Sequence, residues 1–211
     1  MDNVWTKLVR NYPELDVCLS DIQKAADTII HTYRRGGMVL VCGNGGSAAD
    51  SEHIVGELMK GFMLKRPVGA DMREKLEDAF PGEGEALADN LQGALPAISL
   101  VSHTALATAF ANDVAPDMVF AQQVFGYARP VDTVIGISTS GNSSNVVKAL
   151  QVARSLGAAT IGMTGGHGGR MKEICDTTIC VPYDSTPDVQ ERHLPIYHAI
   201  CIAVEEEFFE S

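Results

Sequence analysis

A chain of 211 residues is long enough for one domain with a sizeable core, and its 45% hydrophobic and 20% charged residues are ordinary for a globular protein. The formal net charge of −11 argues against binding of a nucleic-acid backbone, which needs a basic stripe. No apolar run reaches membrane-spanning length and residues 1–7 show no secretory signal, so we expect a cytoplasmic protein with neither a membrane nor a nucleic-acid partner.

The cysteines are odd in number, scattered, and mostly set within apolar runs. Such a pattern is typical of buried thiols in a reducing cytoplasm, and it favours neither a disulfide framework nor a zinc knuckle. The five thiols belong to Cys18, Cys42, Cys175, Cys180 and Cys201.

Residues 1–36 carry helical apolar spacing in two stretches, Val4 to Val9 and Leu15 to Tyr33. Pro13 fits the break before the second stretch, and Gly36-Gly37 fits its end. We therefore expect an N-terminal helical hairpin ahead of the first strand.

Five short apolar runs follow, and most of them lead through turn residues into a helical pattern. Alternation of this kind predicts a parallel sheet with right-handed crossovers and helices on both faces, which is a three-layer α/β fold. Ligands of such sheets bind at the carboxyl ends of the strands. The expected strands are residues 38–42, Ala97–Val101, Thr133–Ile137, Ala159–Met163 and Thr177–Val181.

One segment interrupts this alternation. Residues 65–95 are polar, acidic and rich in proline and glycine, with two short helical patterns at Met72–Phe80 and Glu85–Leu91. We interpret the segment as an insertion or lid within a single domain, while a surface elaboration without function stays open. The chain is expected to close with one long helix, Val189 to Phe209.

The first motif is the glycine-rich turn Cys42–Ser47, which runs into a helix carrying His53 and Glu57. Residues four apart on a helix project from one face, so the imidazole and the carboxylate are expected to lie together. The turn lacks the Gly-Lys-Ser/Thr of a nucleotide-binding loop and is not G-x-G-x-x-G. Ser47 and Asp50 resemble a capping box. A tight turn with nothing bound is the alternative.

The second motif is Ser138-Thr139-Ser140-Gly141-Asn142-Ser143, which follows an apolar strand and precedes a helical pattern. Its hydroxyls and the N–H groups of an opening helix can surround a phosphate without any lysine or arginine. The alternative is a helix cap with excess serines. A third loop, residues 164–169, is interpreted as a flexible turn with a solvated His167.

Together these motifs and the five-strand plan resemble the sugar isomerase (SIS) domain, which is flavodoxin-like, and within it the phosphoheptose isomerases, also called sedoheptulose 7-phosphate isomerases. The resemblance extends over nearly the whole chain except residues 65–95. It implies that the phosphate contacts are Ser138, Thr139, Ser140 and Ser143. It also implies that the other substrate contacts are Asn44, Gly45, Gly46, Glu57, Asn112, Asp113 and Gln190.

The same resemblance implies one Zn²⁺ per subunit, and two histidines, a carboxylate and an amide oxygen form a plausible site for that ion. Gln190 and His198 are eight residues apart, about 12 Å along a straight helix. They reach one ion only if Gln190 precedes the helix, if the helix bends at Pro195, or if different subunits contribute. The implied ligands are His53, Glu57, Gln190 and His198.

The reaction implied is an aldose–ketose conversion by proton transfer between adjacent carbons. We hypothesise that Glu57 removes the proton and that His198 is the partner acid or base, with Zn²⁺ stabilising the enediolate oxygen. A ligated carboxylate is a poorer base, so the role of Glu57 stays open. Pro187 stands where the family often has aspartate. This difference and the insertion of residues 65–95 leave the length of the sugar substrate open. His103 and His193 are interpreted as structural.

Two other classes of function remain open at this point. A non-catalytic SIS scaffold of the replication-initiator-associating type would not need all four implied metal ligands. A sugar-phosphate sensor would keep the serine loop without the metal set. The resemblance and the surplus of apolar helix faces predict a homo-oligomer, most simply a homotetramer.

Overall fold

The computed structural model describes residues 3–209 and contains one sheet of five parallel strands in the order β2-β1-β3-β4-β5. All five predicted strands are confirmed, although β2 ends two residues earlier and β4 two residues later than expected. Most residues of these strands are buried, because helices cover both faces of the sheet. The strands are β1 (Val39–Gly43), β2 (Ala97–Ser99), β3 (Thr133–Ile137), β4 (Ala159–Gly165) and β5 (Thr177–Val181).

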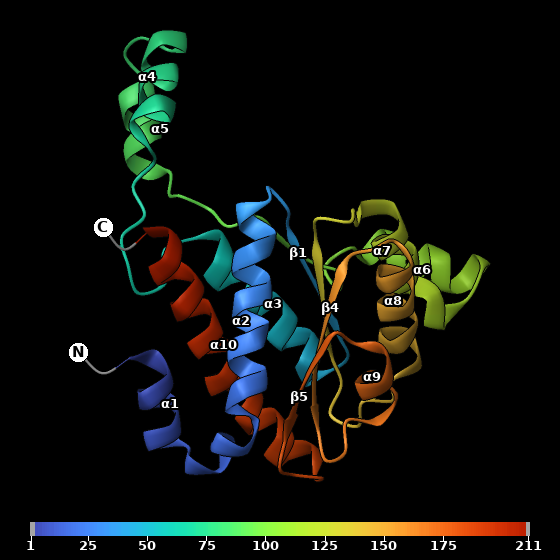
Figure 1. Ribbon diagram of the computed structural model, residues 1–211. Helices are drawn as coiled ribbons and strands as arrows, with labels where there is room; N and C mark the ends of the chain where they lie inside the picture. The colour runs from blue at the N-terminus through green and yellow to red at the C-terminus, as the bar shows by residue number, and fades with distance from the viewer. Residues whose placement is uncertain (1–2, 210–211) are drawn as a thin grey trace.

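Helices pack on both faces of the sheet and give the predicted three layers (Figure 1). Two separate apolar clusters result, one on each face of the sheet. The first face is covered by α1 (Val4–Asn11), α2 (Leu19–Arg34), α3 (Gly46–Met59) and α10 (Thr186–Phe209). The second face is covered by α6 (Thr104–Asp113), α7 (Val119–Tyr127), α8 (Ser144–Ser155) and α9 (Gly169–Ile174), with a 3₁₀ turn, η2, at Pro116–Met118.

The N-terminal hairpin differs from the expected one at its second helix. Residues 13–18 form a 3₁₀ turn, η1 (Pro13–Cys18), and α2 begins only at Leu19. Pro13 stands in the first helical turn, where its missing N–H costs nothing. The prediction of a regular helix from Leu15 is therefore wrong by four residues, because apolar spacing does not distinguish the tighter turn.

The strand order places a topological switch point between β1 and β3. The chain leaves β1 toward β2 on one side of the sheet, whereas β3 is followed by β4 and β5 on the other side. Gly43 of β1 lies opposite Ile137 of β3, so the glycine-rich turn and the serine-rich loop begin at the same level. Ligands of open parallel sheets bind at such a point.

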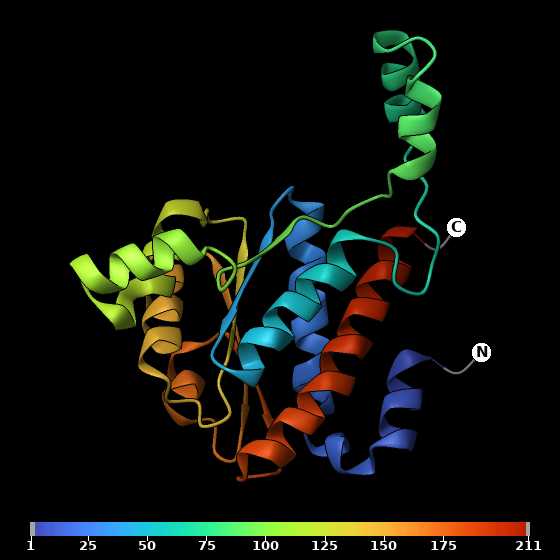
Figure 2. The same cartoon turned by 180° about the vertical axis from the view of Figure 1, so that it is seen from behind.

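The segment between α3 and β2 forms a two-helix arm, α4 (Ala70–Ala79) and α5 (Gly84–Asn90), which confirms both predicted short helices. The arm stands away from the body at the N-terminal edge of the sheet (Figures 1 and 2). An antiparallel bridge between Pro67 and Gln92 closes its base. The glycine-rich and serine-rich loops of the same chain lie at the opposite edge of the sheet. The role of the arm as an insertion or lid stays a prediction.

The last helix is three residues longer than predicted and contains Pro195. Gln190 lies inside this helix, so the option that it precedes the regular helix is wrong.

Cys18, Cys42 and Cys201 are buried, and burial raises the pKa of each of these thiols to about 12. Within residues 3–209, no helix combines the length and the apolar character needed to cross a bilayer.

Candidate active site

The glycine-rich turn delivers α3 at a defined point on the sheet. Gly45 precedes the helix with φ of +56°, a conformation that favours glycine, and Ser47 is already buried in the first turn. The predicted capping box is therefore wrong, because the helix begins before Ser47 and no side chain caps it. A Cβ on Gly46 would lie 2.6 Å from Nε2 of Gln190, so α10 packs directly against this turn.

Three of the predicted ligand side chains meet between α3 and α10. His53 Nε2 lies 3.1 Å from Glu57 Oε1 and 3.4 Å from His198 Nε2, so His53 is the shared member of the group. In a tetrahedral zinc site, two ligand atoms at the usual distances from the ion lie about 3.3 Å apart. Across residues 3–209, no three or more His, Cys, Asp or Glu side chains form a ready cage for a metal ion. The group is thus an open cluster with suitable pairwise separations.

Electrostatics around this cluster favour the neutral form of the His198 imidazole. Burial and the neighbouring His53 lower the pKa of His198, while Glu57 opposes the shift. The second oxygen of Glu57 accepts a hydrogen bond from Lys60 at 3.2 Å. The side chain of Glu57 is 12% exposed and that of His53 is 41% exposed, so the cluster is open to a ligand from solvent.

Gln190 is set apart from these three side chains. Its amide rests against Gly46 at the N-terminal end of α3, and it lies eight residues before His198 on α10. The rise between them is about 12 Å along a regular helix. The structure thus brings together His53, Glu57 and His198 but places Gln190 at the floor of the glycine-rich turn, and its role as a ligand stays a prediction.

The serine-rich loop forms a compact turn at the N-terminus of α8. The hydroxyls of Ser138 and Ser143 are 2.8 Å apart, and the Asn142 N–H donates to Ser140 Oγ at 3.2 Å. Ser143 precedes the helix, but its side chain makes no capping hydrogen bond. Its hydroxyl is shared with Ser138 and lies at the N-terminus of α8, where an anion is stabilised.

Two neighbouring loops support the serine-rich loop. The amides of Asn44 and Asn145 exchange hydrogen bonds of 2.9 and 2.8 Å, which join the turn after β1 to the start of α8. The Arg170 N–H donates to Asn142 Oδ1 at 3.0 Å, which ties the start of α9 to the same loop. Sequence reasoning missed Asn145 and the contact made by the loop after β4. Asn145 lies two residues after the serine-rich motif, and this proximity was its only signal.

Replacing Gly141 with alanine is expected to destabilise the protein by more than about 1 kcal/mol and to disturb the serine-rich loop. Gly141 has φ of +66°, and a Cβ there would lie 2.0 Å from the Gly168 carbonyl oxygen. Urea denaturation measures the effect. Gly126→Ala is the matched control, because a Cβ at this position of α7 meets no atom within 4 Å. A Gly141→Ala variant as stable as wild type would contradict the close approach of the two loops.

The remaining predicted residues lie outside these two groups. Asn112 and Asp113 end α6 on the second face of the sheet, are exposed, and hydrogen bond to each other at 2.8 Å. Their role as substrate contacts stays a prediction. His193 is buried, and burial lowers its pKa to about 4, in keeping with a structural role. His103 packs against Tyr127 at the start of α6.

Comparison with known proteins places this chain in a family. The sequence model of the SIS domain matches residues 16–75 and 76–165, so the matched residues include the arm. Phosphoheptose isomerase of Trichlorobacter lovleyi is 39% identical over 188 residues, which span 89% of this chain and 83% of that protein. Phosphoheptose isomerase of Akkermansia muciniphila is 36% identical over 94% of this chain and 92% of that protein.

Solved structures agree with these relatives. Phosphoheptose isomerase from Neisseria gonorrhoeae superimposes with a TM-score of 0.74 at 30% identity, covering 95% of this chain and 94% of that chain. The enzyme from Francisella tularensis gives a TM-score of 0.75 at 29% identity, covering 93% and 91%. The chain therefore belongs to the SIS domain family and, within it, to the phosphoheptose isomerases.

Proposed function

We propose that this protein is a metal-assisted aldose–ketose isomerase that converts sedoheptulose 7-phosphate into D-glycero-D-manno-heptose 7-phosphate for heptose biosynthesis. The observation that carries the proposal is the meeting of His53, Glu57 and His198 on one side of the glycine-rich turn. An aldose–ketose conversion needs a base at the carbon-bound hydrogen and an acid at the carbonyl. A carboxylate and a neutral imidazole in one open cluster supply both.

The side chains present fit a zinc ion. His53, Glu57 and His198 would hold it, since two imidazole nitrogens and a carboxylate oxygen at separations of 3.1 and 3.4 Å suit its ligand preferences. Bound there, the ion would supply Lewis-acid polarisation of a sugar oxygen. Gln190 is the proposed fourth ligand, and it would have to approach from its place against Gly46.

The proposed roles of the chain's own residues follow from their positions. The Glu57 carboxylate takes the proton from the carbon next to the carbonyl, and the His198 imidazole moves the second proton. Lys60 donates a hydrogen bond to the other oxygen of this carboxylate at 3.2 Å. The hydroxyls of the serine-rich loop hold the phosphate and so fix the far end of the sugar.

Replacing Ser143 with alanine is expected to raise KM for the sugar phosphate about 10- to 100-fold with a smaller effect on kcat. A hydrogen bond to a charged phosphate contributes about 1.5–3 kcal/mol, and the change removes the contact between Ser143 and Ser138 but no capping hydrogen bond of α8. Steady-state kinetics measures the effect. Ser144→Ala is the control, because that hydroxyl donates instead to Asp117 at 3.1 Å. Equal KM values in both variants would contradict the phosphate assignment.

We also propose a cytoplasmic homotetramer. An apolar groove of about 200 Å³ between α1 and α10 reaches His198, and exposed Leu194 lies on its wall. Two further apolar side chains, Tyr12 and Ile202, line the same groove. Sedimentation equilibrium of the full chain tests the assembly, and a monomer at micromolar concentration would contradict it.

Product analysis by NMR tests the reaction itself. The purified protein is incubated with ketose 7-, 6- and 5-phosphates, with and without a chelator, and with zinc restored. Formation of a heptose 7-phosphate that stops with the chelator and returns with zinc is the expected result. No turnover of any ketose phosphate after zinc addition would overturn the proposal in favour of a scaffold or a sensor.

A further inference from the structure

The two-helix arm, residues 70–91, has little packing of its own within one chain. Its helices contact each other more than they contact the body, and α4 contains no buried residue. Helices of ten and seven residues are marginal in water unless another surface supports them. A further surface would therefore stabilise the arm.

The exposed surface of the arm is both apolar and acidic. Four large apolar side chains are 44–54% exposed, those of Met72, Phe80, Leu87 and Leu91. Phe80 lies at the tip, in the turn between α4 and α5. Residues 70–91 also hold seven acidic and two basic side chains, a net charge of −5. A complementary surface is therefore apolar, lacks acidic groups and has positive charge beside it.

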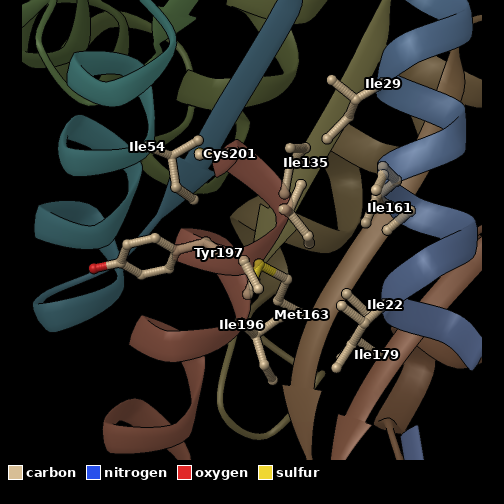
Figure 3. Close-up of a cluster of buried hydrophobic side chains, with 14 of the residues drawn as sticks. Ile22, Ile29, Ile54, Ile135, Ile161, Met163, Ile179, Ile196, Tyr197 and Cys201 are labelled. Carbon is tan, nitrogen blue, oxygen red and sulfur yellow. The ribbon is translucent and has the colours of Figure 1, made fainter. Parts of the chain in front are cut away.

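The groove between α1 and α10 has these properties. Figure 3 shows Ile196 and Tyr197 of α10 among the buried side chains of the first face, so the other side of this helix, with Leu194, is left for the groove. None of the described residues that line the groove is acidic, and Lys7 is among them. The basic residues of α1 are Lys7 and Arg10, and this helix has no acidic residue.

The size of the groove favours a side chain as its occupant. Its volume is about 200 Å³ and its lining is mostly apolar. Pockets for small molecules usually measure about 300–1,000 Å³ and carry several polar groups. An apolar side chain with a neighbouring acidic group thus fits the groove better than a phosphorylated sugar does.

The position of the arm points to a second copy of the chain. The bridge between Pro67 and Gln92 closes the base of the arm, which from there extends away from the groove of its own chain (Figure 1). Arm and α1 lie on the same side of the molecule in both views (Figures 1 and 2). Two copies that face each other across a two-fold axis can therefore exchange arms in a closed contact. Pairing of two arms would instead bring two acidic surfaces together.

We propose that the arm of a second copy docks on the groove between α1 and α10, with the partner's Phe80 seated beside His198. Because the groove reaches His198, the docked arm covers one side of the cluster formed by His53, Glu57 and His198. The arm is then a lid that one copy supplies to the site of another. This inference rests on the homo-oligomer of the proposed function, and it adds which segment makes the contact and which surface receives it.

Disulfide trapping in the full-length protein tests the contact. One double variant combines Phe80→Cys with Leu194→Cys, and a second combines it with Tyr12→Cys, since both of these residues line the groove. Under mild oxidation, at least one double variant is expected to form a disulfide-linked dimer. Mass spectrometry of the linked peptides identifies the bridge.

Phe80→Cys with Phe125→Cys is the matched control. Phe125 is 66% exposed but lies on α7, on the other face of the sheet, so no linked dimer is expected. The wild-type protein controls for bridges among the five native cysteines.

Each other outcome overturns the proposal. A linked dimer of Phe80→Cys alone would show that two arms pair with each other. A bridge within one chain, or no bridge at either groove position, would exclude docking by a second copy. If the dimer forms but the protein turns over no sugar phosphate, the docking stands and the proposed reaction fails; turnover without a bridge has the opposite meaning.

A charge reversal tests why the arm and the groove recognise each other. Lys7→Glu, added to the double variant that bridges, is expected to slow dimer formation about 5-fold, because it removes an attraction to the acidic arm. The difference is expected to shrink in 1 M salt, which screens exposed charges. Lys172→Glu on α9 is the control, since this exposed lysine lies on the other face of the sheet. Equal rates in the two variants at low salt would overturn the acidic arm as the occupant.

Discussion

Replacing Glu57 with glutamine is expected to lower kcat about 10²- to 10⁴-fold while the protein stays folded. Proton transfer by a positioned side chain contributes about this much to a rate, and glutamine keeps the size of the side chain but cannot take up a proton. Glu57 is held between His53 and Lys60 at the surface of α3, so the change leaves the core intact. Coupled isomerase kinetics and thermal denaturation measure the two quantities.

Glu52→Gln is the matched control on the same helix. Glu52 is exposed and accepts a hydrogen bond from Ser102 at 2.9 Å, so its loss is expected to leave kcat unchanged. Saturating zinc separates the two roles of Glu57. If zinc restores full activity to Glu57→Gln, the carboxylate is only a ligand and its assignment as the base is wrong.

The second large effect is expected at Arg66, which is completely buried. Its guanidinium donates to Glu205 at 2.7 Å and to the carbonyl oxygens of Leu58 and Glu57, so it caps the end of α3. Glu205 also accepts from three backbone N–H groups, those of residues 62–64. Arg66→Met is expected to destabilise the protein by about 3–5 kcal/mol, because it leaves a buried charge without its counter-ion.

Urea denaturation measures this loss, and Arg73→Met is its control. Arg73 pairs with Glu77 and Asp89 on the exposed arm, where an ion pair contributes at most about 1 kcal/mol. Equal stabilities of the two variants would contradict a structural role for the buried pair. Because Arg66 holds the backbone of Glu57, its loss is also expected to weaken zinc binding.

The same pair makes stability depend on pH. Burial alone raises the pKa of Glu205, but the N–H groups of Phe62 and Met63 and the Arg66 guanidinium outweigh it and hold the pKa below its ordinary value. The stability contributed by the charged carboxylate is therefore full above the unfolded pKa of about 4.3 and is lost as pH falls through the folded pKa. Unfolding free energies measured in urea below pH 5 are expected to fall less steeply in Glu205→Gln.

The strand, turn and helix elements that carry the candidate site could be predicted from the sequence because each is local. The turn after β1 and the loop after β3 each follow a buried strand, and parallel strands bring their ends to one edge. The pairing of His53 with Glu57 needs only helical periodicity. The prediction of a capping box is wrong for a local reason as well, since the positive φ of Gly45 lets α3 begin before Ser47.

Contacts between distant residues required the folded chain. No spacing rule relates Arg66 to Glu205, or Asn44 to Asn145, because the chain between the partners could pack in many ways. The same holds for the hydroxyl of Tyr197, whose neighbours on α3 are set by the packing of α10.

The amino-acid sequence alone was sufficient for the α/β alternation, the two loops that follow β1 and β3, and the His53–Glu57 pair, since each depends on periodicity and turn chemistry over a few residues. Only the tertiary structure decided that His198 contacts the pair while the Gln190 amide rests against Gly46, and that the arm stands at the opposite edge from the loops. The physical reason is that helix packing sets the crossing of α3 and α10, and that crossing determines which side chains face each other.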